Sequence, residues 1–174
     1  MRIGLGILWG AALVLAACSG SHPSSSNASG QSTSSVARIG QPAPDWVEPL
    51  APKGTLSLAS LRGKAVYLNF FATWCPPCNE EAPAINALQQ RYAADGLRVV
   101  GVDVLESAAK AQAFRTEHHL VYPAVVDDGT LRRQYNVNGL PVHVFIDRQG
   151  IVRNIVVGEL SAASIRADVL KVLH

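Results

Sequence analysis

Phe70-Phe71-Ala72-Thr73-Trp74-Cys75-Pro76-Pro77-Cys78 is the stretch of this sequence that decides the fold. It joins a nearly continuous apolar run, residues 65–71, to a segment whose apolar residues recur at helical spacing. Such a run is typical of a buried central strand. A Cys-x-x-Cys pair between a buried strand and the start of a helix is a strong signal of a redox-active dithiol.

The spacing of the two cysteines places both sulfur atoms on the first helical turn, within bridging range of each other. Cys75 is expected near the N-cap, where the helix dipole and free N–H groups stabilise a thiolate. Pro76 and Pro77 lack an N–H, which leaves mainly the N–H groups of Cys78 and Asn79 as donors to the Cys75 sulfur. We therefore expect Cys75 to be the nucleophile and Cys78 to attack the resulting mixed disulfide. The competing interpretations are half a zinc site and a structural disulfide, but the sequence has neither a second Cys-x-x-Cys nor a histidine at ligand spacing.

The predicted helix after the cysteines has one core-facing stripe, made at steps of three and four by Cys78, Glu81, Ile85, Leu88 and Tyr92. Glu81 therefore lies on the apolar stripe, whereas Glu80 lies on the solvent side. Burial raises the pKa of a carboxyl group, which would make Glu81 a proton acceptor for Cys78 near neutral pH. The alternative is that the Glu81 side chain extends past a kink at Pro83 into solvent.

Outward from this motif, strands and helices alternate. Further strands are predicted at 98–104, 142–146 and 151–157, and helices at 107–118 and 161–173. A turn at Asp147-Arg148-Gln149-Gly150 makes the last two strands a hairpin, and residues 46–50 and 55–58 form another around Pro52-Lys53-Gly54. The pattern predicts an α/β domain with a mixed sheet, helices on both faces and an N-terminal hairpin.

Composition excludes several classes of protein. The chain has 174 residues, of which 48% are hydrophobic, so it can form a packed core and is not globally disordered. A formal net charge of +2 without a basic block argues against a nucleic-acid partner. Three cysteines are too few for a disulfide-stapled scaffold or a four-cysteine zinc site.

The first residues indicate export. Met1-Arg2 and the apolar run 3–17 are typical of a signal peptide and short for a membrane span. Leu15-Ala16-Ala17-Cys18 resembles a bacterial lipobox, in which Cys18 is acylated after cleavage; a plain signal peptide or an uncleaved anchor is the alternative. Residues 18–35 are then a serine-rich tether, and residues 36–174 the domain. This predicts a protein outside the cytoplasm, lipid-anchored at the periplasmic face or cell surface of a bacterial membrane.

The motif and its surroundings resemble the TlpA/ResA-like group of thioredoxin-fold proteins, which includes the DsbE/CcmG proteins of cytochrome c maturation. The similarity extends to Ile39-Gly40-Gln41-Pro42-Ala43-Pro44-Asp45, to residues 58–64, and to Gly139-Leu140-Pro141 with the strand and turn that follow. The resemblance implies a thioredoxin-like fold and a cis peptide bond at Pro141. It also implies that Trp74, Leu140 and Pro141 bind substrate, with the Leu140 backbone pairing to an extended segment. An ordinary trans turn proline is the alternative for Pro141.

The sequence also departs from its relatives. Asn69 stands where thioredoxin has a buried acid, and ResA-like proteins resemble this chain in placing a Glu where Glu81 stands. Val142 and His143 follow Pro141, where a Thr is frequent in the group; we interpret His143 as a packed or surface residue. His118-His119 closes a helix, and Asp127-Asp128-Gly129 is interpreted as a turn, not a calcium loop.

Together these features predict an extracytoplasmic thiol–disulfide oxidoreductase that needs no cofactor or metal. We expect it to reduce disulfides in exported proteins, such as apocytochrome c, with electrons from a membrane thiol–disulfide donor, and to be a monomer. A disulfide-forming oxidase of the same fold is one alternative. A copper metallochaperone is another, although the initiator is the chain's only Met. The sequence around the cysteines does not resemble a thiol peroxidase.

Overall fold

The structure is a computed structural model that describes residues 36–174. The expected signal peptide (residues 1–17), the lipidation site Cys18 and the tether (residues 18–35) lie outside the described residues. Within residues 36–174, no helix combines the length and the apolar character needed to cross a membrane.

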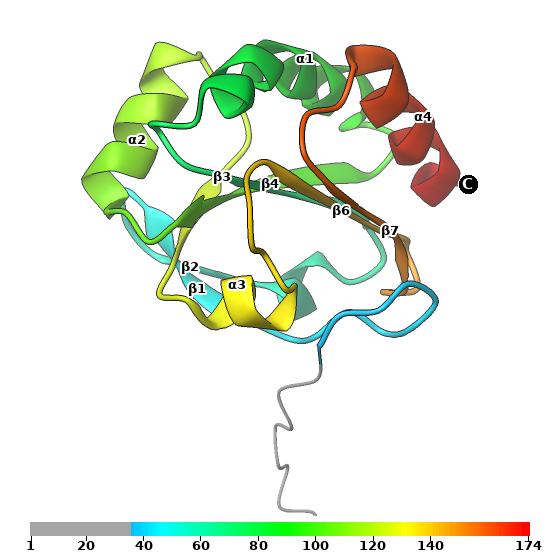
Figure 1. Ribbon diagram of the computed structural model, residues 1–174. Helices are drawn as coiled ribbons and strands as arrows, with labels where there is room; N and C mark the ends of the chain where they lie inside the picture. Colours follow the sequence, from blue (N-terminus) through cyan, green and yellow to red (C-terminus); the bar gives the residue numbers. More distant parts are fainter. Residues whose placement is uncertain (1–35) are drawn as a thin grey trace, which may run out of the picture. The chain divides into compact units, whose positions relative to one another are not determined.

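A seven-stranded mixed sheet forms the centre of the domain, in the order β2-β1-β5-β4-β3-β6-β7 (Figure 1). Its middle consists of three parallel strands, β3 (Ala65–Phe71), β4 (Leu97–Val104) and β5 (Ala124–Asp127). Every residue of β3 is buried, as its continuous apolar character predicts for a strand covered on both faces.

Two hairpins complete the sheet, one at each edge. Strands β6 (Val142–Ile146) and β7 (Val152–Val157) pair with each other, and β6 pairs antiparallel with β3. At the other edge, β1 (Val47–Ala51) pairs with β2 (Thr55–Ser57) and with β5, both antiparallel. The mixed sheet and the N-terminal hairpin are confirmed.

Helices cover both faces of the sheet. Helices α1 (Pro76–Tyr92), α2 (Ala108–Glu117) and α4 (Ala162–Leu173) lie on one face, and the short α3 (Thr130–Gln134) lies on the other (Figure 1). A 3-10 turn, η1 (Leu58–Leu61), packs on the α3 face. Because residues alternate along a strand, Tyr67 and Phe71 of β3 join the core under α1 and α4. Leu68 and Phe70 join the core on the α3 face.

The sequence analysis did not predict β5 or α3. Four and five residues long, they are too short to show a periodicity of their own. The turn expected at Asp127-Asp128-Gly129 joins them. There the Asp127 carboxylate accepts N–H bonds from Gly129, Leu131 and Arg132, and so satisfies donors at the start of α3.

Candidate active site

The two cysteines lie where the sequence predicts, at the junction of β3 and α1. Cys75 is the N-cap of α1, and Pro76 and Pro77 are its first residues. Cys75 and Cys78 form a disulfide, with their Cα atoms 5.3 Å apart. The exposed fractions of Cys75 and Cys78 are only 3% and 2%, so a partner can contact only a small part of the disulfide.

Few backbone donors remain for a Cys75 thiolate. Pro76 and Pro77 contribute none, and the N–H of Asn79, one of the two expected donors, is bonded to the Cys75 carbonyl at 3.2 Å. The N–H of Cys78 is then the main donor left on the first turn. A thiolate with fewer donors is less stabilised, which favours a reducing couple.

A buried carboxylate on the neighbouring loop holds the segment before Cys75. The Glu106 carboxylate accepts the Thr73 N–H at 2.6 Å and the Thr73 hydroxyl at 2.9 Å. The exposed Lys110 ammonium bonds the same group at 2.9 Å. Burial opposes ionisation of Glu106, but the bonds from Thr73 and Lys110 outweigh it and lower its pKa.

Asn79 fixes the same segment from the helix side. Its amide nitrogen donates to the carbonyls of Thr73 and Cys75, at 3.2 and 2.8 Å. Its amide oxygen lies 2.9 Å from His118 Nε2. His118 thus connects the end of α2 to the active-site loop, a contact that its position at a helix terminus does not reveal.

Glu81 is buried one turn beyond Cys78, as the helical stripe predicts, and only 4% of its surface is exposed. Oε1 accepts the backbone N–H of Leu160, and Oε2 has no hydrogen bond within residues 36–174. Burial, opposed by the Leu160 bond and supported by the charge of Glu159, raises the pKa of Glu81 to about 7. Glu80 is exposed, so the two adjacent acids differ as expected.

His143 is fully buried beside Glu81, which the sequence analysis did not anticipate. Its Nδ1 lies 2.7 Å from the Tyr67 hydroxyl, and its Nε2 lies 3.1 Å from the Gly158 carbonyl and 3.5 Å from Glu81 Oε2. The register of β6 places it directly opposite Asn69 on β3. That cross-strand pairing could have signalled the contact, because Asn69 faces the same core layer as Tyr67.

The approach of His143 to Glu81 is not an ion pair near neutral pH. A carbonyl oxygen can only accept, so Nε2 carries the ring proton, and Nδ1 accepts the hydroxyl proton of Tyr67. Burial lowers the pKa of His143 to about 4, despite the Gly158 bond and the charge of Asp168. A neutral imidazole therefore faces a carboxyl group that titrates near neutrality.

Asp103 is a second buried acid near the dithiol loop. It lies opposite Phe71 in the sheet, is fully buried, and neither carboxyl oxygen has a hydrogen-bond partner within residues 36–174. Burial, together with the nearby Glu106, raises its pKa to about 7. Sequence reasoning missed it because it lies near the end of a mostly apolar strand.

An apolar rim surrounds the covered disulfide. Trp74 is 69% exposed, and the side chains of Trp74, Leu105 and Leu140 line a hollow of about 250 Å³ together with Arg132. The Leu140–Pro141 peptide bond is cis, as the resemblance implies. The predicted substrate-binding residues Trp74 and Leu140 thus share one hollow next to the cysteines.

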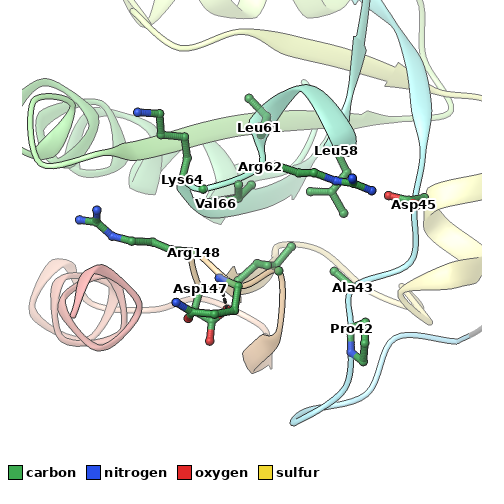
Figure 2. A pocket seen from close by; sticks show the side chains of 14 residues that line it. Pro42, Ala43, Asp45, Leu58, Leu61, Arg62, Lys64, Val66, Asp147 and Arg148 are labelled. Carbon is green, nitrogen blue, oxygen red and sulfur yellow. Dashed lines mark hydrogen bonds between the residues drawn. The ribbon is translucent and has the colours of Figure 1, made fainter.

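A second hollow, of about 360 Å³, lies at the other end of β3 (Figure 2). Val66, near the start of β3, and Ile146, at the end of β6, line it, and Arg62, Lys64 and Arg148 stand around it. Because Cys75 follows the opposite end of β3, this hollow is separate from the dithiol.

Comparisons with known proteins agree with this geometry. The model of the AhpC/TSA family matches residues 39–155. The thiol-disulfide oxidoreductase ResA of a Bacillus cereus strain is 32% identical over 136 residues, covering 78% of this chain and 79% of that protein.

Two solved structures share the thioredoxin-like fold. A thioredoxin-family thiol:disulfide interchange protein from Chlorobium tepidum TLS superposes with a TM-score of 0.72 at 33% identity, over 79% of this chain and 99% of that chain. A secreted Mycobacterium tuberculosis disulfide oxidoreductase homologous to E. coli DsbE gives a TM-score of 0.67 at 25% identity, over 72% and 95%.

Proposed function

The chain belongs to the AhpC/TSA family as a ResA-type thiol–disulfide oxidoreductase, and from that premise we propose that it reduces disulfides in exported proteins through Cys75 and Cys78. The haem-site cysteines of apocytochrome c are one such substrate. The observation that carries the proposal is the covered disulfide at the start of α1, with the Glu81 carboxyl group buried one turn behind Cys78.

The reaction begins from the reduced dithiol. The Cys75 thiolate attacks one sulfur of the substrate disulfide, and the other substrate sulfur leaves as a thiolate that takes up a proton. Cys78 then gives its proton to Glu81 and attacks the Cys75 sulfur, and the second substrate sulfur leaves as a thiolate that takes up a proton, as the first did. Two electrons have passed to the substrate, and the protein holds its disulfide. A membrane thiol–disulfide donor must return two electrons to it.

Substrate recognition is proposed to use the apolar rim. Trp74 and Leu105 of this rim are each more than half exposed. Large exposed apolar side chains are typical of a surface that contacts another protein. An extended substrate segment would lie against Leu140 and Pro141, with one side chain in the hollow beside Trp74.

The location is also a proposal. Residues 1–17 would direct export and Cys18 would carry the lipid, so that the domain works beside a membrane, outside the cytoplasm, on a tether formed by residues 18–35. The relative described as a secreted oxidoreductase supports an extracytoplasmic site of action. The balanced charge argues against nucleic acid, and we propose that the domain acts as a monomer.

A copper metallochaperone is a weaker candidate. Within residues 36–174 the only group of three potential metal ligands is formed by Glu48, Asp127 and Asp128, which includes neither cysteine. Its all-oxygen chemistry does not suit Cu(I).

One set of measurements on the purified protein separates these functions. We expect catalytic reduction of insulin disulfides that is lost in the Cys75→Ser variant, with neither stoichiometric copper binding nor peroxide consumption. Copper binding or peroxide turnover without insulin reduction would contradict the proposal.

The direction is tested by the reduction potential of the Cys75–Cys78 couple. Since few donors remain for the Cys75 thiolate, we expect a value close to that of thioredoxin, about −270 mV, and not to that of DsbA, about −120 mV. Equilibration with a glutathione buffer and counting of alkylated thiols measures it. A potential near that of DsbA would favour the oxidase.

A further inference from the structure

Buried polar groups form a chain that ends at the free oxygen of Glu81. Tyr67 on β3 contacts His143 on β6, and His143 contacts both the Gly158 carbonyl and Glu81 on α1. The side chains of His143 and Glu81 are 0% and 4% exposed, so no bulk solvent screens the contact. The reaction described above assigns no part to Tyr67 or His143.

The neighbours of the ring fix where its proton lies. Tyr67 offers its hydroxyl to Nδ1, and the Gly158 carbonyl requires a donor, so the proton is on Nε2. That N–H is donated to Gly158 O at 3.1 Å, and the same nitrogen lies 3.5 Å from Glu81 Oε2, without a hydrogen bond to it. The tautomer is therefore set by Tyr67 and the Gly158 carbonyl, independently of Glu81.

We propose that His143 is a positioning residue, whose Nε2–H group is held 3.5 Å from the unpaired oxygen of Glu81 and favours, through its dipole, the ionised carboxylate that accepts the Cys78 proton. This inference rests on the proposed function, because it concerns the step in which Cys78 attacks the mixed disulfide. An N–H dipole directed at a buried carboxylate stabilises its charged form, whereas burial alone would keep it protonated.

Other ionisable groups face this pair, and their contributions stay constant in a comparison of His143 variants. Cys78 lies one turn away on α1, Glu159 precedes the Leu160 N–H that bonds Glu81, and Tyr122 and Tyr67 are buried near Glu81. Asp168 on α4 acts on His143. The test must therefore remove the N–H without changing the charge of the site.

Two substitutions distinguish the contact of Nε2 with Glu81 from the contact of Nδ1 with Tyr67. In His143→Gln an amide donor takes approximately the place of Nε2 and can still reach Glu81. In His143→Asn the shorter side chain can reach Tyr67 but not Glu81. Each variant is measured alone and together with Glu81→Gln, which removes the carboxyl group whose ionisation His143 is proposed to favour.

The readout is the reaction of the reduced protein with a symmetric aromatic disulfide whose thiolate is coloured. Attack by Cys75 releases one coloured thiolate, and attack by Cys78 on the mixed disulfide releases the second. The pH midpoint of the second phase reports the group that accepts the Cys78 proton. Circular dichroism of each variant shows separately that the domain is folded.

We expect His143→Asn to raise the midpoint of the second phase by roughly half to one pH unit, and His143→Gln to leave it near that of the unaltered protein. The difference should vanish with Glu81→Gln. Tyr67→Phe removes the hydroxyl that bonds Nδ1, so the ring proton is less firmly held on Nε2, and the midpoint should rise by less. This variant keeps the test decisive if His143→Asn does not fold.

The positioning role is overturned if the Asn and Gln variants share one midpoint or if the shift persists with Glu81→Gln. If His143→Asn does not fold, an unchanged midpoint in Tyr67→Phe overturns it. These results differ from a failure of the proposed function, in which the unaltered protein would not reduce insulin disulfides. That outcome would end both proposals.

Discussion

Two adjacent glutamates have different environments because helical geometry turns one toward the core and the other toward water. Glu81 is buried behind Cys78 with its pKa raised to about 7, whereas Glu80 is exposed. Glu81→Gln should slow attack by Cys78 on a trapped mixed disulfide by roughly tenfold or more at neutral pH, and remove the pH dependence near 7. Glu80→Gln serves as the control and should stay within about twofold. Equal, small effects of both substitutions would contradict the assigned role.

At this scale the sequence predicted contacts within one element but not those between elements. The burial of Glu81 follows from residues three and four apart on α1, and the N-cap position of Cys75 follows from the same count. The contact of Glu81 with His143 depends on how α1 crosses β6, and on the register that sets His143 opposite Asn69. No local pattern encodes that geometry, so the sequence supported only the interpretation of His143 as a packed or surface residue.

Among the elements, the long strands and helices were predictable because each shows enough periods of its pattern. Helix α1 runs to Tyr92 through Pro83, and the edges of the predicted strands agree with the structure within a few residues. The short β5 and α3 were missed because their formation depends on the neighbours: β4 pairs with β5, and Asp127 caps α3.

The loop between β3 and α1 depends on a carboxylate from the loop after β4. Because Glu106 satisfies both the N–H and the hydroxyl of Thr73, we expect Glu106→Ala to lower the free energy of unfolding by about 1–3 kcal/mol at pH 7. Hydrogen bonds lower the pKa of Glu106 in the folded state. Its contribution to stability is therefore fully present above the pKa that the Glu106 carboxyl group has in the unfolded chain, and it is lost as the pH falls through the folded-state pKa. Urea unfolding of the oxidised protein measures the difference.

The control is Lys110→Ala, because the Lys110 side chain is 61% exposed, and solvent screens its ion pair with Glu106 so that the pair should add little to stability. If both substitutions destabilised the protein equally, the ion pair, and not the bonds to Thr73, would be the main contribution of Glu106.

For the whole molecule, buried acids should give an unusual dependence of stability on pH. Glu48, Glu81 and Asp103 have pKa values raised to about 7, so between about pH 4.5 and 7 the folded state holds protons that the unfolded chain releases. His143 has the opposite effect. Because its pKa is lowered to about 4, it stays neutral in the folded state below about pH 6.5, where the histidine of the unfolded chain binds a proton. Unfolding thus releases up to two protons net, and stability falls as the pH rises, by at most about 3 kcal/mol per unit.

We therefore expect a higher melting temperature at pH 5 than at pH 8 for the oxidised protein, measured by calorimetry. Asp103→Asn should reduce the difference, because the amide cannot titrate. A melting temperature that rises from pH 5 to pH 8 would show that these carboxyl groups are ionised in the folded state.

Anchoring also belongs to the whole molecule. If Cys18 carries the lipid, Cys18→Ala should release the protein from the membrane fraction while the dithiol reacts with insulin at an unchanged rate. Fractionation followed by detection of the protein measures the first effect. Tight membrane association of the variant would contradict lipid attachment at Cys18.

The contrast between two tryptophans has an optical consequence. Of the indoles within residues 36–174, Trp46 is buried, whereas Trp74 is 69% exposed and adjoins Cys75. A disulfide quenches the fluorescence of an indole beside it more strongly than two thiols do. Reduction should therefore brighten the long-wavelength emission of the solvated Trp74 and leave the shorter-wavelength emission of Trp46 nearly constant. The ratio of the two emissions should then report the oxidation state of the dithiol without a dye or label, which a fluorescence titration with a reductant checks.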